Sequence, residues 1–211
     1  MSMNLIQRID DIIEAGSLLK HPFYRMWSEG RLTRPMLAGY SKEYYQLVKA
    51  VPLYMESILS VAPRSDELES NMREEYEHIP LWEDFAAGLG VPRGDLATYE
   101  GLEKTRSAVS SLHGLMDGYR VGAAAMYSLE KEIPEISRTK LEGLREFYGM
   151  DEHTEYFVQH MEADVRHAGD WRRILEVPGS DDEELVRVAQ ESVLAQNLIL
   201  DACYEAYCDN N

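Results

Sequence analysis

The sequence predicts an all-α fold, a bundle of helices in a single domain that spans residues 1–211. Apolar residues recur at helical spacing in segment after segment, and no alternating pattern or tight-turn dipeptide indicates a β-hairpin. Proline and glycine fall between the periodic segments, where they mark roughly seven to nine helices. The chain is long enough to bury a substantial core, and no shift in composition marks an internal boundary.

The first third of the chain predicts two helices separated by a tight junction. The apolar stripe in residues 5–13 has helical spacing and ends near His21 and the proline that follows it. Thr33 then resembles an N-cap with a proline just inside the helix, which predicts a long helix over residues 34–59. Pro52 lies inside that helix, so we expect a kink there.

The middle of the chain predicts shorter helices. Ser65 can cap a helix that continues past residue 78, and the proline at position 80 predicts a second kink. Residues 88–94 contain glycines and a Val-Pro pair, which is typical of a loop. A helix over residues 105–115 follows, and Gly118 separates it from the next.

The last part of the chain predicts four helices. The first, over residues 119–132, contains a run of small residues from Gly122 to Ala125, where a neighbouring helix can approach closely. Pro134 breaks or bends the chain before a helix over residues 136–148. Two longer helices, over residues 152–175 and 181–207, complete the bundle.

The composition excludes several classes of partner. A net charge of −17 argues against nucleic acid and against anionic membrane surfaces, because both bind clustered lysine and arginine. Nothing at the N-terminus resembles a signal peptide, and no apolar run is long enough to span a bilayer. Cys203 and Cys208 lie about 140° apart around a helix, so they do not suit an intrahelical disulfide. We therefore expect a cytoplasmic protein.

Residues 160–167 carry the strongest functional pattern. His160, Asp164 and His167 are spaced at i, i+4 and i+7, which places their side chains within about 60° of one another around a helix. Two imidazoles and a carboxylate on one stripe are a poor way to build a core and a good way to hold a metal. An ordinary solvated helix face with paired charges is the alternative reading of the same stripe.

Two further segments supply ligands of the same kind. Glu75 and His78 form a Glu-x-x-His unit, which recurs in helical bundles that bind metals in their cores. Glu130 follows the small-residue run on an otherwise apolar helix. Each segment alone also fits an acidic surface cluster, but the three together predict a site for two Fe or Mn ions. A structural zinc site would instead be rich in cysteine.

At these residues the chain resembles the haem-oxygenase-like oxidases, in particular the branch named for the chlamydial protein associating with death domains. The resemblance rests on motifs that occur in order: His21-Pro-Phe-Tyr24, the Trp-Ser-Glu-Gly-Arg-Leu-Thr stretch, Glu75-x-x-His78, Glu130-x-Glu-Ile-Pro134, Arg138-x-Lys140 and the His160–His167 triplet. It implies a core of seven helices. It also implies a dinuclear iron or mixed manganese–iron centre that activates O₂, with an external reductant and, by analogy of fold, a homodimer.

The resemblance assigns roles to particular residues. The implied metal ligands are Glu75, His78, Glu130, His160, Asp164 and His167. The branch includes self-sacrificing synthases of 4-aminobenzoate, the folate precursor, in which a tyrosine of the protein supplies the ring and a lysine is implicated as amino donor. The matching positions are Tyr24 and Lys140, with Tyr40 and Tyr156 as further tyrosines of the site.

Two departures and three rival functions stay open at this point. Leu129 stands where the branch usually has a tyrosine, with Tyr127 as the nearest substitute, and the spacing of Glu75 and His78 is short for the branch. That spacing is closer to relatives that decarboxylate fatty acids or fragment amino acids, so the same centre could oxidise an external small molecule. An interaction protein that is not an enzyme is another reading. A cofactorless or thiamin-degrading relative is the last, and it leaves the aligned acids and histidines unexplained.

Overall fold

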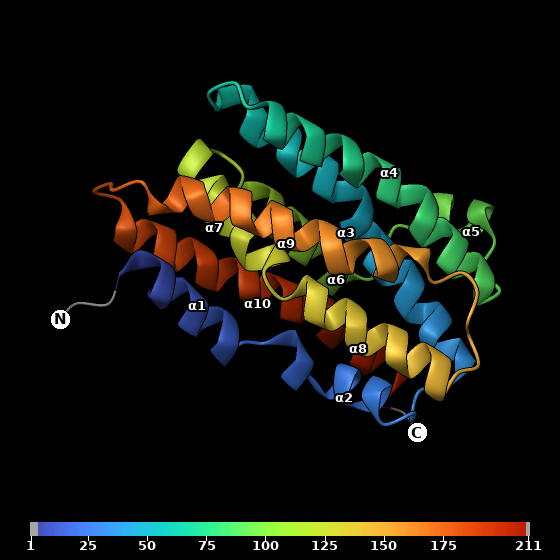
Figure 1. The fold of residues 1–211 in the computed structure, drawn as a ribbon. Helices are drawn as coiled ribbons and strands as arrows, with labels where there is room; N and C mark the ends of the chain where they lie inside the picture. Colours follow the sequence, from blue (N-terminus) through green and yellow to red (C-terminus); the bar gives the residue numbers. More distant parts are fainter. Residues whose placement is uncertain (1–3, 210–211) are drawn as a thin grey trace.

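The computed structural model describes residues 4–209, and within that range it contains helices and no strand. The all-α prediction is confirmed (Figure 1). In chain order the elements are α1 Leu5–Ala15, the 3₁₀ turn η1 Leu18–Lys20, α2 Pro22–Ser28, α3 Arg34–Val61, α4 Asp66–Gly88, α5 Arg93–Thr98, α6 Glu103–Gly114, α7 Tyr119–Glu130, α8 Ile133–Glu146, α9 Glu155–Glu176 and α10 Asp182–Tyr207.

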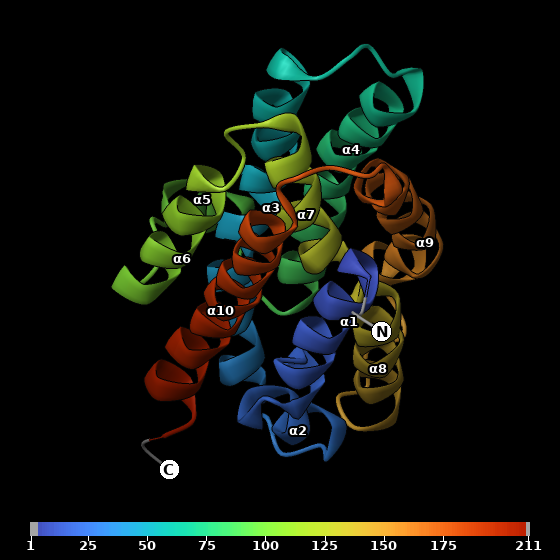
Figure 2. The ribbon, with the colours of Figure 1, turned by 90° about the vertical axis from the view of Figure 1, so that its left-hand side faces the viewer.

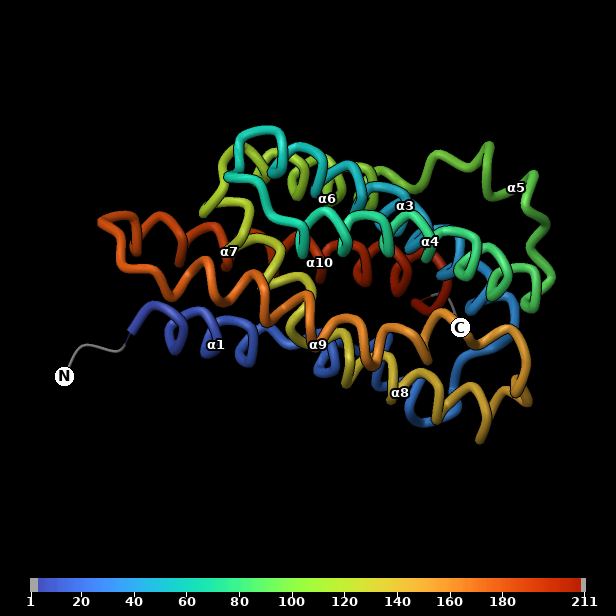
Figure 3. The backbone as a smooth tube through the Cα atoms, turned by 45° about the horizontal axis from the view of Figure 1, so that its top comes forward, coloured from blue at the N-terminus to red at the C-terminus, as the bar shows by residue number. Residues whose placement is uncertain are grey.

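The long helices run side by side and form the walls of the bundle. Helix α3 packs against α4, α10 packs against α6 and α7, and α9 packs against both α7 and α8. Seen from the end, α5 and α6 lie on one side and α8 and α9 on the other, with α3, α7 and α10 between them (Figure 2). Figure 3 shows α1 lying along the side of the bundle near α9. The interior between α3, α4, α7 and α9 is where the candidate site lies.

The helix boundaries show which local signals decided the fold. The Ser65 hydroxyl accepts from the Leu68 amide and caps α4, as predicted. The His21 side chain accepts from the Phe23 amide and caps α2, a short helix where the sequence indicated only a junction. Helix α5 was also missed, because six residues carry too little periodicity to stand out from a loop. Pro134 lies in the first turn of α8, where proline is well tolerated, and does not interrupt it.

The small-residue run allows the close helix contact that it predicts. A side chain added at Gly122 would overlap that of Ile58, so the backbone of α7 packs directly against the Ile58 side chain of α3. Ala123, Ala124 and Ala125 are fully buried. The hydroxyl of Ser192 on α10 donates to the Ala125 carbonyl at 2.9 Å. Close packing on two sides fixes α7, which ends at Glu130 inside the bundle.

No helix of residues 4–209 combines the length and the hydropathy needed to cross a membrane.

Candidate metal centre

Helices α4, α7 and α9 bring the six predicted ligands to one place in the interior. Helix α4 supplies two of them, the last turn of α7 supplies one, and the inner face of α9 supplies three. All six side chains are buried, with at most 6% of any of these residues exposed to solvent: Glu75, His78, Glu130, His160, Asp164 and His167. The solvated-face reading of the α9 stripe is therefore excluded for these residues.

The distances divide five of the six residues into two groups that share Glu75, and Glu130 belongs to neither group. Possible ligand atoms of Glu75, His78 and His160 lie within 4.8 Å of one another, and so do those of Glu75, Asp164 and His167. The Oε2 atom of Glu75 lies 3.3 Å from His78 Nδ1, and its Oε1 atom lies 3.3 Å from His167 Nδ1. A carboxylate placed between two sets of ligands can serve both of two adjacent cations.

Three polar atoms of this cluster are buried without a hydrogen-bond partner: Glu130 Oε1, Asp164 Oδ2 and His167 Nδ1. Buried polar atoms are nearly always paired, so three orphans in one cluster need an explanation. A bound cation supplies one, because it would accept a lone pair from each atom. Carboxylate oxygens mixed with imidazole nitrogens and no thiolate suit iron or manganese. The residues present therefore fit a pair of such ions.

The pKa shifts of the cluster also indicate a site that suits bound cations. Burial raises the pKa of Glu130 well above its usual value, and nearby Asp164 and Glu75 add to the effect. Burial also opposes ionisation of Glu75, but contacts with His167 and His78 outweigh it and lower the pKa of Glu75. For His167, burial is outweighed by Asp164 and Glu75, which raise its pKa to about 11.

Contacts outside the ligand set orient these side chains. His160 donates from Nδ1 to the Tyr156 carbonyl at 2.7 Å, which leaves Nε2 free to bind a cation. Glu74 Oε2 lies 3.2 Å from His167 Nε2 and also accepts from Arg166. Such carboxylate–histidine contacts fix the ring and raise the basicity of its other nitrogen. Sequence reasoning missed Glu74, because an acidic cluster gives no sign of which glutamate faces inward.

Glu130 has an outer contact of its own. The Trp171 indole, buried on α9, donates to Glu130 Oε2 at 2.8 Å. One carboxylate oxygen is thereby fixed, and the other is the orphan that faces the cluster. Trp171 also escaped sequence reasoning. Its spacing of four residues from His167, on the same face of the helix, was the available signal.

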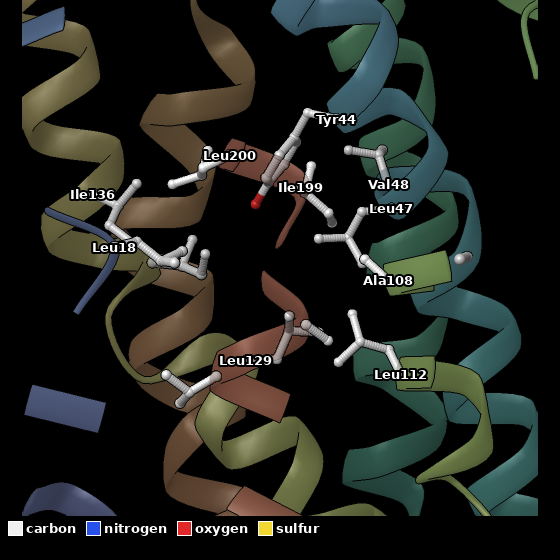
Figure 4. Packing of buried hydrophobic residues seen from close by; sticks show 14 of the residues in the cluster. Leu18, Tyr44, Leu47, Val48, Ala108, Leu112, Leu129, Ile136, Ile199 and Leu200 are labelled. Carbon is white, nitrogen blue, oxygen red and sulfur yellow. The ribbon is translucent and has the colours of Figure 1, made fainter. Parts of the chain in front are cut away.

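A small cavity of about 30 Å³ adjoins the ligands. Glu75, Glu130, His160 and Asp164 line one part of it, and the remainder is formed by Tyr156, by Ile133 of α8 and by residues of α3 and α7. Figure 4 shows Tyr44, Leu47 and Val48 on α3, with Leu129 below them. That volume holds one or two water-sized molecules. Leu129, which replaces the tyrosine of the resembling branch, is thus part of the apolar wall.

The predicted tyrosine and lysine residues meet in a second buried cluster. The Tyr24 and Tyr40 hydroxyls are 3.1 Å apart, and Lys140 Nζ is 2.6 Å from the Tyr40 hydroxyl. The same nitrogen lies 4.7 Å from the centre of the Tyr24 ring and 4.7 Å from that of Tyr44. All of these side chains are at most 7% exposed. The lysine is therefore enclosed by aromatic rings drawn from α2 and α3.

Lys140 has no acidic partner within ion-pair distance among residues 4–209. Aromatic faces attract an ammonium group, but each such contact contributes only about 0.5–2 kcal/mol. Burial of an unpaired charge costs more, and it lowers the pKa of Lys140 well below its usual value. This environment therefore favours the neutral amine form of the side chain, which is both a nucleophile and a base.

Tyr156 belongs to the metal cluster and not to the lysine cluster. Its ring is stacked on that of His160, with 3.9 Å between the ring centres. Tyr127, the sequence-based substitute for the tyrosine missing at position 129, donates its hydroxyl to Asp10 on α1 at 2.7 Å. Its ring forms no aromatic pair with either cluster among the described residues. It is therefore poorly placed to replace that tyrosine.

Comparison with known proteins identifies the family and agrees with the fold. Residues 39–198 match a haem-oxygenase-like family described as iron-containing redox enzymes. The chain belongs to this family. It is 37% identical over 207 residues to a 4-aminobenzoate synthase of Chlamydia muridarum, across 92% of this chain and 86% of that protein. It is 30% identical over 227 residues to a 4-aminobenzoate synthase of Nitrosomonas europaea, across 97% and 92% of the two chains.

Solved structures show the same fold at lower identity. A TenA homologue from P. horikoshii superposes with a TM-score of 0.80 at 15% identity, over 95% of this chain and 96% of that one. A domain of unknown function with a heme oxygenase-like fold from Shewanella denitrificans also gives a TM-score of 0.80, at 20% identity, over 96% and 91% of the two chains. The haem-oxygenase-like fold expected from the resemblance is confirmed.

Proposed function

We propose that this chain is a 4-aminobenzoate synthase that consumes its own Tyr24 and takes nitrogen from Lys140. A pair of iron ions, or a manganese and an iron, bound by Glu75, His78, Glu130, His160, Asp164 and His167 would supply the oxidising power from O₂. The observation that carries the proposal is the position of a neutral amine 4.7 Å from the centre of the Tyr24 ring. The curated relatives named above support the same activity.

The chemistry of the product matches these two residues. 4-Aminobenzoate is a benzene ring with an amino group and a carboxylate at opposite positions. Tyrosine has the same ring, with a hydroxyl where the amino group must be and Cβ where the carboxylate must be. Tyr24 can therefore supply the ring and one side-chain carbon, and Lys140 the nitrogen. Formation of the carboxylate breaks the Cα–Cβ bond, so each chain would react once.

The fold controls this reaction through placement and exclusion of water. Tyr24 and Tyr40 are at most 2% exposed, and the Tyr40 hydroxyl bridges the Tyr24 hydroxyl and Lys140 Nζ. That bridge fixes the amine beside the ring and gives the phenol proton a path to a base. Because burial keeps Lys140 neutral, its lone pair is available without prior loss of a proton.

The cavity bears on the rival function, an oxidase with an external substrate. About 30 Å³ beside the ligands has room for O₂ but not for a fatty acid or an amino acid, whose pockets are typically about 300–1,000 Å³. A wider open groove of about 360 Å³ lies over α7, α8 and α9, but it reaches only Asp164 of the six ligands. These dimensions favour a substrate that is already in the chain.

The test is to load the protein with Fe(II) and a reductant and then to admit O₂. We expect 4-aminobenzoate in the filtrate, a mass loss in the chain localised to Tyr24, and ¹⁵N in the product when the protein carries ¹⁵N-lysine. Tyr24→Phe should form no product. Tyr148→Phe is the matched control, because Tyr148 packs on the same Trp27 ring without touching Lys140. Product formed while Tyr24 stays intact would overturn the proposal.

A further inference from the structure

The two clusters are separate, and aromatic rings lie between them. Oxidation at Tyr24 by a centre at His160 therefore requires an electron to cross the space between α2 and α9. Electron tunnelling weakens steeply with distance, so closely spaced aromatic rings are the favoured route. With Leu129 in place of a tyrosine, and Tyr127 directed to Asp10, position 129 offers no such ring.

Two rings bridge the gap: Tyr44 on α3, whose centre lies 5.4 Å from that of Tyr40 and which lines the cavity beside the ligands, and Trp82 on α4. The centre of Trp82 lies 5.9 Å from that of Tyr40 and 4.7 Å from that of Tyr156, and Tyr156 is stacked on His160. On the other side Tyr40 pairs with Tyr24 at 6.2 Å. Trp82 is fully buried and lies one helical turn after His78. It is thus in contact with both clusters at once.

The hydrogen bonds of these rings favour Trp82 over its neighbours as the residue that is oxidised. A tyrosine must lose its phenol proton when it gives up an electron. Among the described residues, the hydroxyls of Tyr44 and Tyr156 form no hydrogen bond, so no neighbouring group is placed to accept that proton. An indole can lose an electron and keep its proton. The Trp82 indole donates to the Ser41 carbonyl at 2.8 Å, and a carbonyl is too weak a base to remove that proton.

We propose that Trp82 relays the electron that leaves Tyr24 toward the metal cluster, while the Tyr24 proton moves through Tyr40 to Lys140. The inference rests on the proposed function. In this step Tyr24 loses one electron and one proton. Tyr40 accepts the Tyr24 proton and passes its own to the Lys140 amine, which holds it as an ammonium group during this step and must lose it again, through the Tyr40 hydroxyl that it contacts, before its lone pair can form the carbon–nitrogen bond. The electron would then tunnel from Trp82 past the Tyr156 ring toward the metal ligands, where the proposed metal pair would supply the oxidant that accepts it, and Trp82 would end in its starting state.

The experiment compares Trp82→Phe with the parent protein and with Phe85→Leu. Phe85 packs against Trp82 at 5.1 Å but contacts neither Tyr40 nor Tyr156, so its variant disturbs the same core without interrupting the route. Each protein is loaded with Fe(II) and exposed to O₂. Iron content, the absorbance change on iron oxidation and the loss of Tyr24 by intact mass are followed separately.

We expect Trp82→Phe to bind iron and oxidise it as the parent does, while its Tyr24 loss slows by more than about tenfold. Phe85→Leu should lose Tyr24 at the parent rate. If Trp82→Phe binds no iron, parent protein with fluorotryptophan at position 82 alone tests the same point, because fluorination makes an indole harder to oxidise with little change of shape. Slower Tyr24 loss at unchanged iron oxidation would support the relay.

The two proposals fail in different ways. The relay would be overturned, and the synthase proposal left standing, if Trp82→Phe lost Tyr24 at the parent rate. If that variant binds no iron, the same result in the fluorotryptophan protein would overturn the relay. Parent protein that oxidises iron without losing Tyr24 would overturn the synthase proposal, and the relay with it.

Discussion

The metal cluster and the Lys140 cluster are both buried and polar, but they balance charge in opposite ways. Around Glu75 the chain gathers carboxylates and imidazoles and leaves three polar atoms unpaired. Around Lys140 it provides aromatic rings and no acid, so the amine stays neutral. The first arrangement suits a cation that comes from outside, and the second suits a reactive group of the chain itself. The difference suggests that oxidant and substrate are kept apart.

The largest effect is expected when a negative charge is removed from the metal cluster. Asp164→Asn keeps the size of the side chain but not its negative charge, and Asp164 Oδ2 is one of the three orphan atoms. We expect metal affinity to fall by more than the ten- to hundred-fold that is typical of outer contacts. Metal per chain after anaerobic loading and desalting measures it. Glu162→Gln, on the exposed face of the same helix, is the control.

Full metal occupancy in Asp164→Asn would mean that the orphan oxygen has another role. The Lys140 cluster serves as an internal check, because the substitution should leave the lowered pKa of that lysine unchanged.

A smaller effect is expected from the outer contact to His167. Glu74→Ala removes the carboxylate that lies 3.2 Å from His167 Nε2. We expect metal affinity to fall about ten- to hundred-fold, because the ring loses its orientation and its nitrogen becomes less basic. Competition with a chelator measures the affinity. Glu77→Gln, exposed on the same helix, should bind as the parent does. An affinity in Glu74→Ala equal to that of the parent would show that His167 is oriented by other contacts.

Lys140→Met tests the neutral amine through stability. Because the pKa of Lys140 is lowered in the folded state, unfolding takes up a proton at any pH between that value and about 10.4. The stability of the parent relative to Lys140→Met should therefore rise with pH in that window, by at most about 1.4 kcal/mol per pH unit. Urea unfolding at several pH values between about pH 7 and pH 9 measures it.

The direction of the pH dependence decides the outcome. Lys104→Met, at an exposed lysine, should show no such trend relative to the parent. A difference between parent and Lys140→Met that stays constant with pH would indicate that Lys140 remains an ammonium group in the folded protein.

The smallest effect is expected from Tyr40→Phe. The change removes the hydroxyl between Tyr24 and Lys140, so two hydrogen bonds are lost and the stability should fall by about 1–3 kcal/mol. Metal content should stay at the parent level, because the hydroxyl does not contact the ligands. Urea unfolding and metal analysis together measure the two effects. Loss of metal in this variant would show that the clusters are not independent.

Much of this molecule could be predicted from the sequence because helical periodicity is local. The spacing of His160, Asp164 and His167 placed them on one face, and the Gly122–Ala125 run predicted a close helix contact. The short helices α2 and α5 were missed, since six or seven residues show little periodicity. Which helix faces which is a property of tertiary packing. For that reason the outer contacts of Glu74 and Trp171 could not be predicted from spacing alone.

The Lys140 cluster shows the same limit. Tyr24, Tyr40 and Lys140 were named through the resemblance, but their mutual contacts join distant parts of the chain: Tyr40 and Lys140 are 100 residues apart. Nothing in the local sequence marks Lys140 as buried. Its neutral state follows only from the aromatic rings that α2 and α3 place around it.

The most direct test of the contrast between the two clusters is a crystal structure of protein loaded with Mn(II) or Fe(II) without oxygen. Anomalous scattering would locate the ions. We predict two peaks among the six buried ligands, with Glu75 contacting both, and no peak beside Lys140. The absence of any peak among these residues, or a single ion bound elsewhere in the bundle, would contradict the account.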